Sequence, residues 1–396
     1  MSIMTRKWVS VLRHSIFCMC LVFMPSMASA EIESDLSEAM RSTIPPPKLK
    51  MASWLLMDAA TGLTLAGSGA DTPVEPASLT KLMTAYIVFR EIERGTVKLD
   101  DIVLISEKAW RSGGSRMFIE AGDKVRIEDL LMGLIVQSGN DAAVALAEHV
   151  AGSEEGFADL MNQTAVEFGM SNSHFVNSAG MPHPDHYTTA RDVTLLTRAI
   201  IDSQPDHYRR YAVREFTWND ITQKNRNPLL GRDSSIDGVK TGHTRSAGYC
   251  LVGSAQRDGM RLIGTVIGAK SDRERADAVY SLLRFGFAAY ENHDLYPAGQ
   301  KIVEPRVFKG EAGAVPLGLS EPIALVLAKG SGKNLKASVS LTDPVVAPVT
   351  QGQELGTLMV TLGDSQLLSR PLVALQGVAA GSWMHRLSDA VRLWFY

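Results

Sequence analysis

The chain has 396 residues, of which 45% are hydrophobic and 21% are charged, and its formal net charge is −3. This composition is typical of a soluble globular protein with room for two or more domains. The near balance of 40 basic and 43 acidic residues argues against a nucleic-acid-binding protein, so no nucleic-acid partner is expected.

Residues 1–30 have the pattern of a cleaved secretory signal peptide. A basic start, a short apolar run and a small-residue cleavage site follow one another as Arg6, Lys7 and Arg13, SIFCMCLVFM (15–24) and ASA (28–30). The alternative is a membrane-anchoring helix, but the apolar run is too short to span a bilayer. We therefore expect an exported protein whose mature chain begins near Glu31.

The next region, 31–293, mixes strand and helix signals. The stretch SWLLMDAATGLTLAG (53–67) predicts two strands joined by a turn, and a helix is predicted over about 77–94. Helical periodicity over 127–152 is interrupted at Ser138–Asn140, so two helices are expected to meet there. Residues 153–203 are expected to be mostly helical and rich in loops.

A hairpin and one further helix complete this first domain. The segment GYCLVGSAQRDGMRLIGTVIGA (248–269) contains two runs rich in strand formers on either side of RDG, a strong hairpin signal. A helix is then predicted over about 272–290.

The pattern changes from about residue 294. Short runs such as PIALVLA (322–328), LKASVSL (335–341) and LGTLMVTL (355–362) alternate with turn formers. They predict a small β-sandwich domain over 294–376, which would serve as a spacer or an interaction module.

The tail, 377–396, is predicted to form an amphipathic helix. One face carries Trp383, Leu387, Val391, Trp394 and Phe395, and the other faces carry charged side chains. Aromatic residues with basic neighbours favour a helix that lies in a membrane interface. The alternative is a helix that docks on the protein's own core.

The stretch PASLTKLM (76–83) places Ser78 and Lys81 one helical turn apart at the start of a helix. Both side chains then lie on one face, where a neutral lysine could take the proton of the serine hydroxyl. Burial or a second cation must lower the lysine pKa for this to happen. Alone, an S-x-x-K match is expected by chance on the order of once in such a chain.

Two further patches follow in order, SGN at 138–140 and KTG at 240–242. Each tripeptide has a chance expectation of about 0.1 or less, and the ordered trio is the signature of β-lactamases and penicillin-binding proteins. KTG precedes the predicted hairpin, so Lys240, Thr241 and Gly242 are expected on an edge strand that can pair with an extended peptide. Gly242 would remove a side chain that blocks approach. Seen alone, Asn140 could simply cap the helix that follows it.

With these motifs, and with RSGGSRMFIEAGD, HYTTARD and EFTWNDITQKNRNPLL, the chain resembles the low-molecular-mass penicillin-binding proteins that are D-alanyl-D-alanine carboxypeptidases. The resemblance covers nearly the whole mature chain. It implies an α/β (α+β) transpeptidase-like catalytic domain with an antiparallel sheet flanked by helices, a small all-β domain and a C-terminal amphipathic helix. The sequence departs from the family at the loop around WRSGGSRMF, which is shorter than in some relatives, and at Arg245, where an acidic residue is often found.

The resemblance also implies roles for individual residues. Ser78 would be the acylated nucleophile, Lys81 its general base, and Ser138 a proton relay to the leaving D-alanine. Asn140 would hold the peptide and Lys81, while Lys240 would be the second cation that lowers the pKa of Lys81.

Other residues would bind the terminal carboxylate of the substrate and the oxyanion of the tetrahedral intermediate. Thr241, Arg226 and Arg275 would meet its terminal carboxylate. The backbone N–H groups of Ser78 and His243 would form the oxyanion hole. The two arginines could instead form ordinary surface ion pairs.

The implied function is removal of the terminal D-alanine from peptidoglycan pentapeptides through an acyl-enzyme, with β-lactams as covalent inhibitors. No metal or other cofactor is expected. The protein would lie on the periplasmic side of the bacterial inner membrane, attached through its tail.

Three alternatives stay open. A β-lactamase would use a glutamate for deacylation. The segment 153–195 offers Glu154, Glu155 and Glu167 as candidates, but none of them lies in a motif of that type. A zinc peptidase could use HPDH (183–186). A wall-binding or shape-maintaining protein could form the acyl-enzyme and turn it over poorly.

Overall fold

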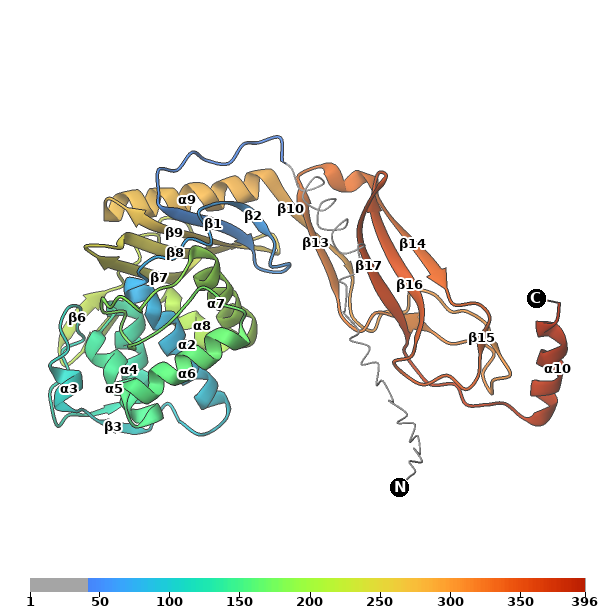
Figure 1. Cartoon of the computed structure of the whole chain (residues 1–396), viewed down its shortest axis with the longest axis horizontal. Coiled ribbons are helices and arrows are strands. Elements are labelled where there is room, and N and C mark those ends of the chain that lie inside the picture. The colour runs from blue at the N-terminus through green and yellow to red at the C-terminus, as the bar shows by residue number, and fades with distance from the viewer. Residues whose placement is uncertain (1–41, 396) are drawn as a thin grey trace, which may run out of the picture.

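The computed structural model describes residues 42–395, which form a larger α/β body, a smaller all-β body and a C-terminal helix (Figure 1). The expected signal peptide at 1–30 lies outside the described residues.

A five-stranded sheet in the order β2-β1-β9-β8-β7 forms the centre of the larger body. All of its neighbouring strands are antiparallel. The strands are β1 (Ser53–Asp58), β2 (Thr64–Ser68), β7 (Ile236–Thr244), β8 (Gly248–Arg257) and β9 (Met260–Ala269). The two strands predicted over 53–67 and the hairpin predicted over 248–269 are thus confirmed.

Both faces of this sheet are covered by helices. Every residue of β1 is buried, and its side chains alternate, with Leu55 and Met57 in one core cluster and Trp54 and Leu56 in the other. In Figure 1, α9 (Asp272–Ala289) crosses one face and the remaining helices of this body gather on the opposite face. Strand β7 lies at one edge of the sheet. Its outer side therefore has no neighbouring strand and is free to border a cleft.

The helix predicted over 77–94 is a short 3-10 turn, η1 (Ala77–Thr80), that continues as α2 (Lys81–Glu93). The predicted break at Ser138–Asn140 is also present: the π-helical turn η2 (Gly133–Gln137) ends there and α5 begins. The other helices of this body are α3 (Glu107–Trp110), α4 (Ile127–Met132), α5 (Asn140–Ala151), α6 (Glu154–Glu167), α7 (Ala190–Ser203), α8 (Pro205–Tyr208) and η3 (Arg209–Ala212).

Two short hairpins lie beside the helical cluster. The first pairs β3 (Ile102–Leu104) with β4 (Lys124–Arg126), and the second pairs β5 (Glu215–Trp218) with β6 (Ile221–Lys224).

The smaller body is all-β, as predicted. Its main sheet has the order β12-β17-β16-β14, and two-stranded sheets β10-β13 and β11-β15 accompany it. The elements are β10 (Tyr290–Tyr296), β11 (Val307–Phe308), β12 (Leu317–Gly318), β13 (Ile323–Ala328), η4 (Ser331–Asn334), β14 (Leu335–Leu341), β15 (Val345–Val346), β16 (Glu354–Leu362) and β17 (Ser365–Ala374). The domain boundary expected between residues 293 and 294 falls within β10.

The last helix, α10 (Trp383–Leu393), contacts the β domain through a polar residue and turns its apolar residues outward. Asp389 is buried, accepts a hydrogen bond from the Lys309 backbone N–H at 2.7 Å and ion-pairs with Arg306. Trp383 and Trp394, by contrast, are 73% and 88% exposed. The alternative of docking its apolar face on the protein's own core is therefore not what the structure shows. Within residues 42–395, no helix has the length and apolar character needed to cross a bilayer.

Candidate active site

A cleft of about 700 Å³ runs between the edge strand β7 and the helical cluster. Its lining brings together residues that lie far apart in the sequence: Ser78, Ser138, Asn140, Arg226, Thr241, Gly242, His243 and Arg275. Lys81 and Lys240 lie buried beside it.

Ser78 and Lys81 meet because the chain begins this helix as a 3-10 turn. In a 3-10 turn, side chains at i and i+3 are eclipsed, and the Lys81 Nζ lies 3.1 Å from the Ser78 Oγ. Ala77, directly before the serine, has a φ of +49°, a conformation that costs a non-glycine residue energy and is often found at functional sites.

The Lys81 Nζ also lies 2.6 Å from the Asn140 Oδ1 and 2.6 Å from the Ala179 carbonyl oxygen. Both oxygens can only accept hydrogen bonds. A neutral amine has two N–H bonds, and these two acceptors use both of them. The remaining lone pair then points toward the Ser78 hydroxyl, which is the arrangement that a general base requires.

The same environment favours the neutral amine. Burial and, to a smaller extent, the charge of Arg226 lower the Lys81 pKa from its usual 10.5, Asp141 acts in the opposite direction, and the resulting pKa is about 7. The sequence had suggested Lys240 as the second cation. In the structure Arg226 is a further cation that acts on Lys81, and Lys81 and Lys240 also interact, because burial and the charge of Lys81 hold the Lys240 pKa well below its usual value.

Ser138 and Asn140 flank the junction between η2 and α5. Ser138 adopts a left-handed conformation with φ +65°, and its buried hydroxyl has no hydrogen-bond partner among residues 42–395. Asn140 is the first residue of α5, while Gly139 occupies the N-cap position. Its amide holds Lys81 on one side and donates from Nδ2 to the Gly113 carbonyl at 2.6 Å on the other, so it does more than begin a helix.

The predicted edge-strand position of KTG is confirmed, since β7 ends the sheet order. Lys240 and Thr241 are buried, and His243 is exposed with its ring 4.1 Å from that of Tyr249. A Cβ on Gly242 would lie 3.3 Å from the Pro76 carbonyl and the Leu79 backbone nitrogen. The missing side chain therefore allows η1 to pack against β7, in addition to any role in substrate approach.

Arg226 and Arg275 both line the cleft but differ in their surroundings. Arg226 is exposed, and burial of part of its guanidinium and the charge of Arg275 lower its pKa. Arg275 is buried, donates to the Gly242 carbonyl at 2.8 Å and the Cys250 carbonyl at 3.1 Å, and ion-pairs with Asp272. Arg275 thus ties β7 to β8 as well as facing the cleft.

A loop over 177–181 completes the site, and the sequence motifs did not reveal it. Asn177 Oδ1 accepts hydrogen bonds from the backbone N–H groups of Gly180 and Met181 at 2.7 and 2.9 Å. Gly180 has φ +83°, and a Cβ there would lie 1.8 Å from the Ala77 carbonyl oxygen. Only glycine fits this close approach. Gly180 is therefore a residue in the sequence that could have indicated a loop packed against the Ser78 turn.

The histidines of HPDH occupy separate environments. His186 is buried, its Nε2 lies 2.8 Å from the Thr80 Oγ1, and its Nδ1 accepts from the Val176 N–H at 3.0 Å. Burial lowers its pKa to about 4. Both ring nitrogens thus already have partners, whereas the His183 side chain is half exposed.

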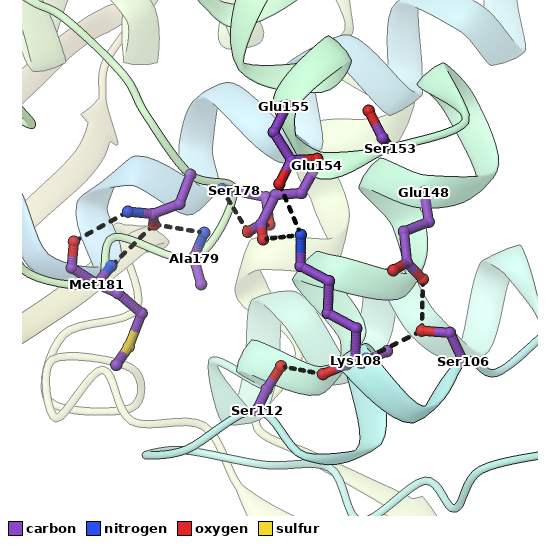
Figure 2. A network of polar contacts seen from close by, with 12 residues as sticks. Ser106, Lys108, Ser112, Glu148, Ser153, Glu154, Glu155, Ser178, Ala179 and Met181 are labelled. Carbon is purple, nitrogen blue, oxygen red and sulfur yellow. Dashed lines mark hydrogen bonds and ion pairs between the residues drawn. The ribbon is translucent and has the colours of Figure 1, made fainter.

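The three glutamates considered for a β-lactamase mechanism also differ in position. Glu154 is 13% exposed and contacts Ser178 and Lys108 (Figure 2). Glu155 and Glu167 are 79% and 60% exposed and form surface ion pairs.

Comparison with known proteins gives consistent results for both bodies. Residues 40–271 match the family model described as D-alanyl-D-alanine carboxypeptidase, and residues 290–380 match the model described as penicillin-binding protein 5, C-terminal domain. The chain is 40% identical over 366 residues to the D-alanyl-D-alanine carboxypeptidase DacC of Escherichia coli, covering 90% of this chain and 92% of the relative.

Solved structures show the same likeness. Penicillin-binding protein 5 from Haemophilus influenzae superposes with a TM-score of 0.80 at 37% identity, covering 85% of this chain and 99% of that one. The penicillin-binding protein D2 of Listeria monocytogenes, solved in its ampicillin-bound form, gives a TM-score of 0.57 at 28% identity, covering 62% and 100%.

Proposed function

The chain belongs to the D-alanyl-D-alanine carboxypeptidase family of penicillin-binding proteins, and from this premise we propose how its own residues carry out the reaction. It is a serine-type enzyme that removes the terminal D-alanine of peptidoglycan pentapeptides. The observation that carries the mechanism is the pairing of Ser78 with a lysine whose two other contacts are both carbonyl oxygens.

In the acylation step, the Ser78 Oγ attacks the carbonyl carbon of the penultimate D-alanine. Its proton passes to the lone pair of neutral Lys81, and a C–O bond forms. When the C–N bond to the terminal D-alanine breaks, the proton held by Lys81 passes through the Ser138 hydroxyl to the leaving amine, which restores neutral Lys81. The unpartnered Ser138 hydroxyl is available for this transfer.

The remaining cleft residues bind the substrate. Arg226, Thr241 and Arg275 supply positive charge and a hydroxyl for its terminal carboxylate. The peptide pairs with β7, Asn140 holds it from the other side, and the backbone N–H groups of Ser78 and His243 stabilise the oxyanion. Water then hydrolyses the ester and returns Ser78 to its free state.

A β-lactam enters as a mimic of this substrate, and its ring amide opens on Ser78. A β-lactamase function is less well supported, because Glu154 is held by Ser178 and Lys108, and Glu155 and Glu167 lie on the surface. A wall-binding or shape-maintaining protein would form the same acyl-enzyme on Ser78. It would differ from a carboxypeptidase in releasing little D-alanine beyond the first equivalent.

A penicillin adduct tests the nucleophile. We expect mass spectrometry of digested, penicillin-treated protein to place one adduct on the peptide that contains Ser78. The Ser78→Ala variant should carry none, while its melting temperature stays close to that of the wild type. An adduct on Ser138, or one that survives in Ser78→Ala, would overturn the assignment.

We also propose that the protein is exported and lies on the periplasmic face of the inner membrane through α10. The signal-like sequence at 1–30 supports export. Trp383 on α10 and Trp394 and Phe395 directly after it are exposed beside Arg392, which supports interfacial binding.

A further inference from the structure

Lys81 depends on a backbone carbonyl whose position is set by residues outside the three motifs. The Ala179 carbonyl belongs to the loop 177–181, and a displaced carbonyl would leave the Lys81 amine free to turn its lone pair away from Ser78. The side chains that hold this loop against the helical cluster therefore also set the direction of that lone pair.

We propose that Glu154 is a positioning residue for Lys81, acting through Ser178 on the Ala179 carbonyl. This inference rests on the proposed role of Lys81 as the base for Ser78.

The contacts run without a gap from α6 to the base, and Figure 2 shows their first part, from Glu154 to Ser178 and Lys108. The Glu154 Oε1 accepts hydrogen bonds from the Ser178 backbone N–H at 3.1 Å and from the Ser178 hydroxyl at 2.8 Å. The carbonyl of Ser178 accepts from the Thr84 hydroxyl at 2.7 Å, on the same helix as Lys81. The next carbonyl along the chain, that of Ala179, accepts from the Lys81 Nζ.

Charge and burial strengthen the contact between the Glu154 carboxylate and Ser178, which anchors the loop 177–181. Glu154 is 13% exposed, and its second oxygen lies 3.1 Å from the Lys108 Nζ on α3. Hydrogen bonds to an ionised carboxylate are shorter and stronger than those between neutral groups. The carboxylate thus fastens the loop to α3 and α6 together.

Glu155 provides a matched control on the same turn of helix. Its carboxylate lies 3.0 Å from the same Lys108 Nζ, but it is 79% exposed, and no contact between it and Ser178 is present in the described residues. Removing Glu155 therefore disturbs the ion pairs of Lys108 and leaves the loop anchor in place.

Loss of Glu154 should act on Lys81 in two ways. A mobile Ala179 carbonyl no longer orients the lone pair, so acylation slows even when Lys81 is neutral. A protonated Lys81 also loses an acceptor, which destabilises its charged form and lowers its pKa. The acid limb of the acylation profile then moves to lower pH.

The test is the second-order rate of acylation by a fluorescent penicillin between pH 5 and 9, with the full chain. We expect Glu154→Ala to lower the plateau roughly tenfold to a hundredfold and to move the acid midpoint below that of the wild type. Glu155→Ala should match the wild type. Glu154→Gln keeps an oxygen acceptor for Ser178, so its plateau should stay within about threefold of the wild type.

A wild-type plateau and midpoint in Glu154→Ala would overturn the proposal, and so would equal losses in Glu154→Ala and Glu155→Ala. If Glu154→Ala fails to fold, Ser178→Ala removes only the hydroxyl contact and should shift the same midpoint in the same direction by a smaller amount; no shift there counts against the proposal. Acylation that persists in Ser78→Ala would instead refute the underlying mechanism.

Discussion

At the scale of single residues, the site works by allowing one buried lysine to lose its proton near neutral pH. Burial and Arg226 hold the Lys81 pKa at about 7, and two carbonyl acceptors direct its lone pair toward Ser78. Acylation should therefore rise about tenfold per pH unit below pH 7 and level off above it.

Replacing Arg226 tests the electrostatic part of this explanation. Arg226 lowers the Lys81 pKa, so its removal must raise that pKa, and the acid limb of acylation should move to higher pH in Arg226→Gln. The midpoint, measured with a fluorescent penicillin, separates this effect from weaker binding, which lowers the rate at every pH. Arg232→Gln is the control, because Arg232 ion-pairs with Asp277 instead. An unmoved midpoint would show that burial alone sets the pKa.

The sequence predicted the side chains of this site but not its backbone contributions. Ser78, Ser138 and Lys240 each stand in a recognisable tripeptide or tetrapeptide, because those residue types are required at fixed spacing. The Ala179 carbonyl has no such signal, since any residue supplies a carbonyl. Glu154 was considered only as a candidate for deacylation, and its contact with Ser178 depends on how two helices and a loop pack.

At the scale of elements, local sequence signals predicted individual strands and turns correctly. The pairing of strands that are distant in the sequence could not be predicted. The 248–269 hairpin followed from RDG, and Asp258 and Gly259 both have positive φ, +48° and +83°, as a tight two-residue turn requires. The pairing of β1 with β9 joins distant segments, and no periodicity indicates it. Strand β17 falls inside the β domain predicted over 294–376 and was not singled out there; it contains Pro371, a residue that argues against an internal strand position.

The C-terminal helix makes the clearest prediction at this scale. Deleting residues 382–396 should release the protein from the membrane fraction, and Trp394→Ser combined with Phe395→Ser should weaken vesicle binding by roughly tenfold or more. Co-sedimentation with anionic lipid vesicles measures both. Trp110→Ser removes an exposed tryptophan of the catalytic body and should bind as the wild type does. A truncated protein that still sediments with membranes would refute the role of α10.

At the scale of the whole molecule, the catalytic body and the exposed helix α10 lie at opposite ends (Figure 1). In Figure 1, the β domain lies between the catalytic body and α10. If α10 lies on the membrane, this arrangement holds the cleft away from the bilayer, which suits an enzyme that acts on peptides of the wall. The sequence predicted the order of the catalytic body, the β domain and the C-terminal helix along the chain. Their arrangement in space could be seen only in the structure.

Sustained turnover is the most direct test of the central claim, because acylation alone would also occur in a binding protein. The full chain is incubated with a peptide that ends in D-alanyl-D-alanine, and free D-alanine is counted per enzyme. We predict release of many equivalents, blocked by penicillin and lowered at least about a thousandfold in Ser78→Ala. A single burst of one equivalent, or undiminished release by Ser78→Ala, would contradict the mechanism proposed for this site.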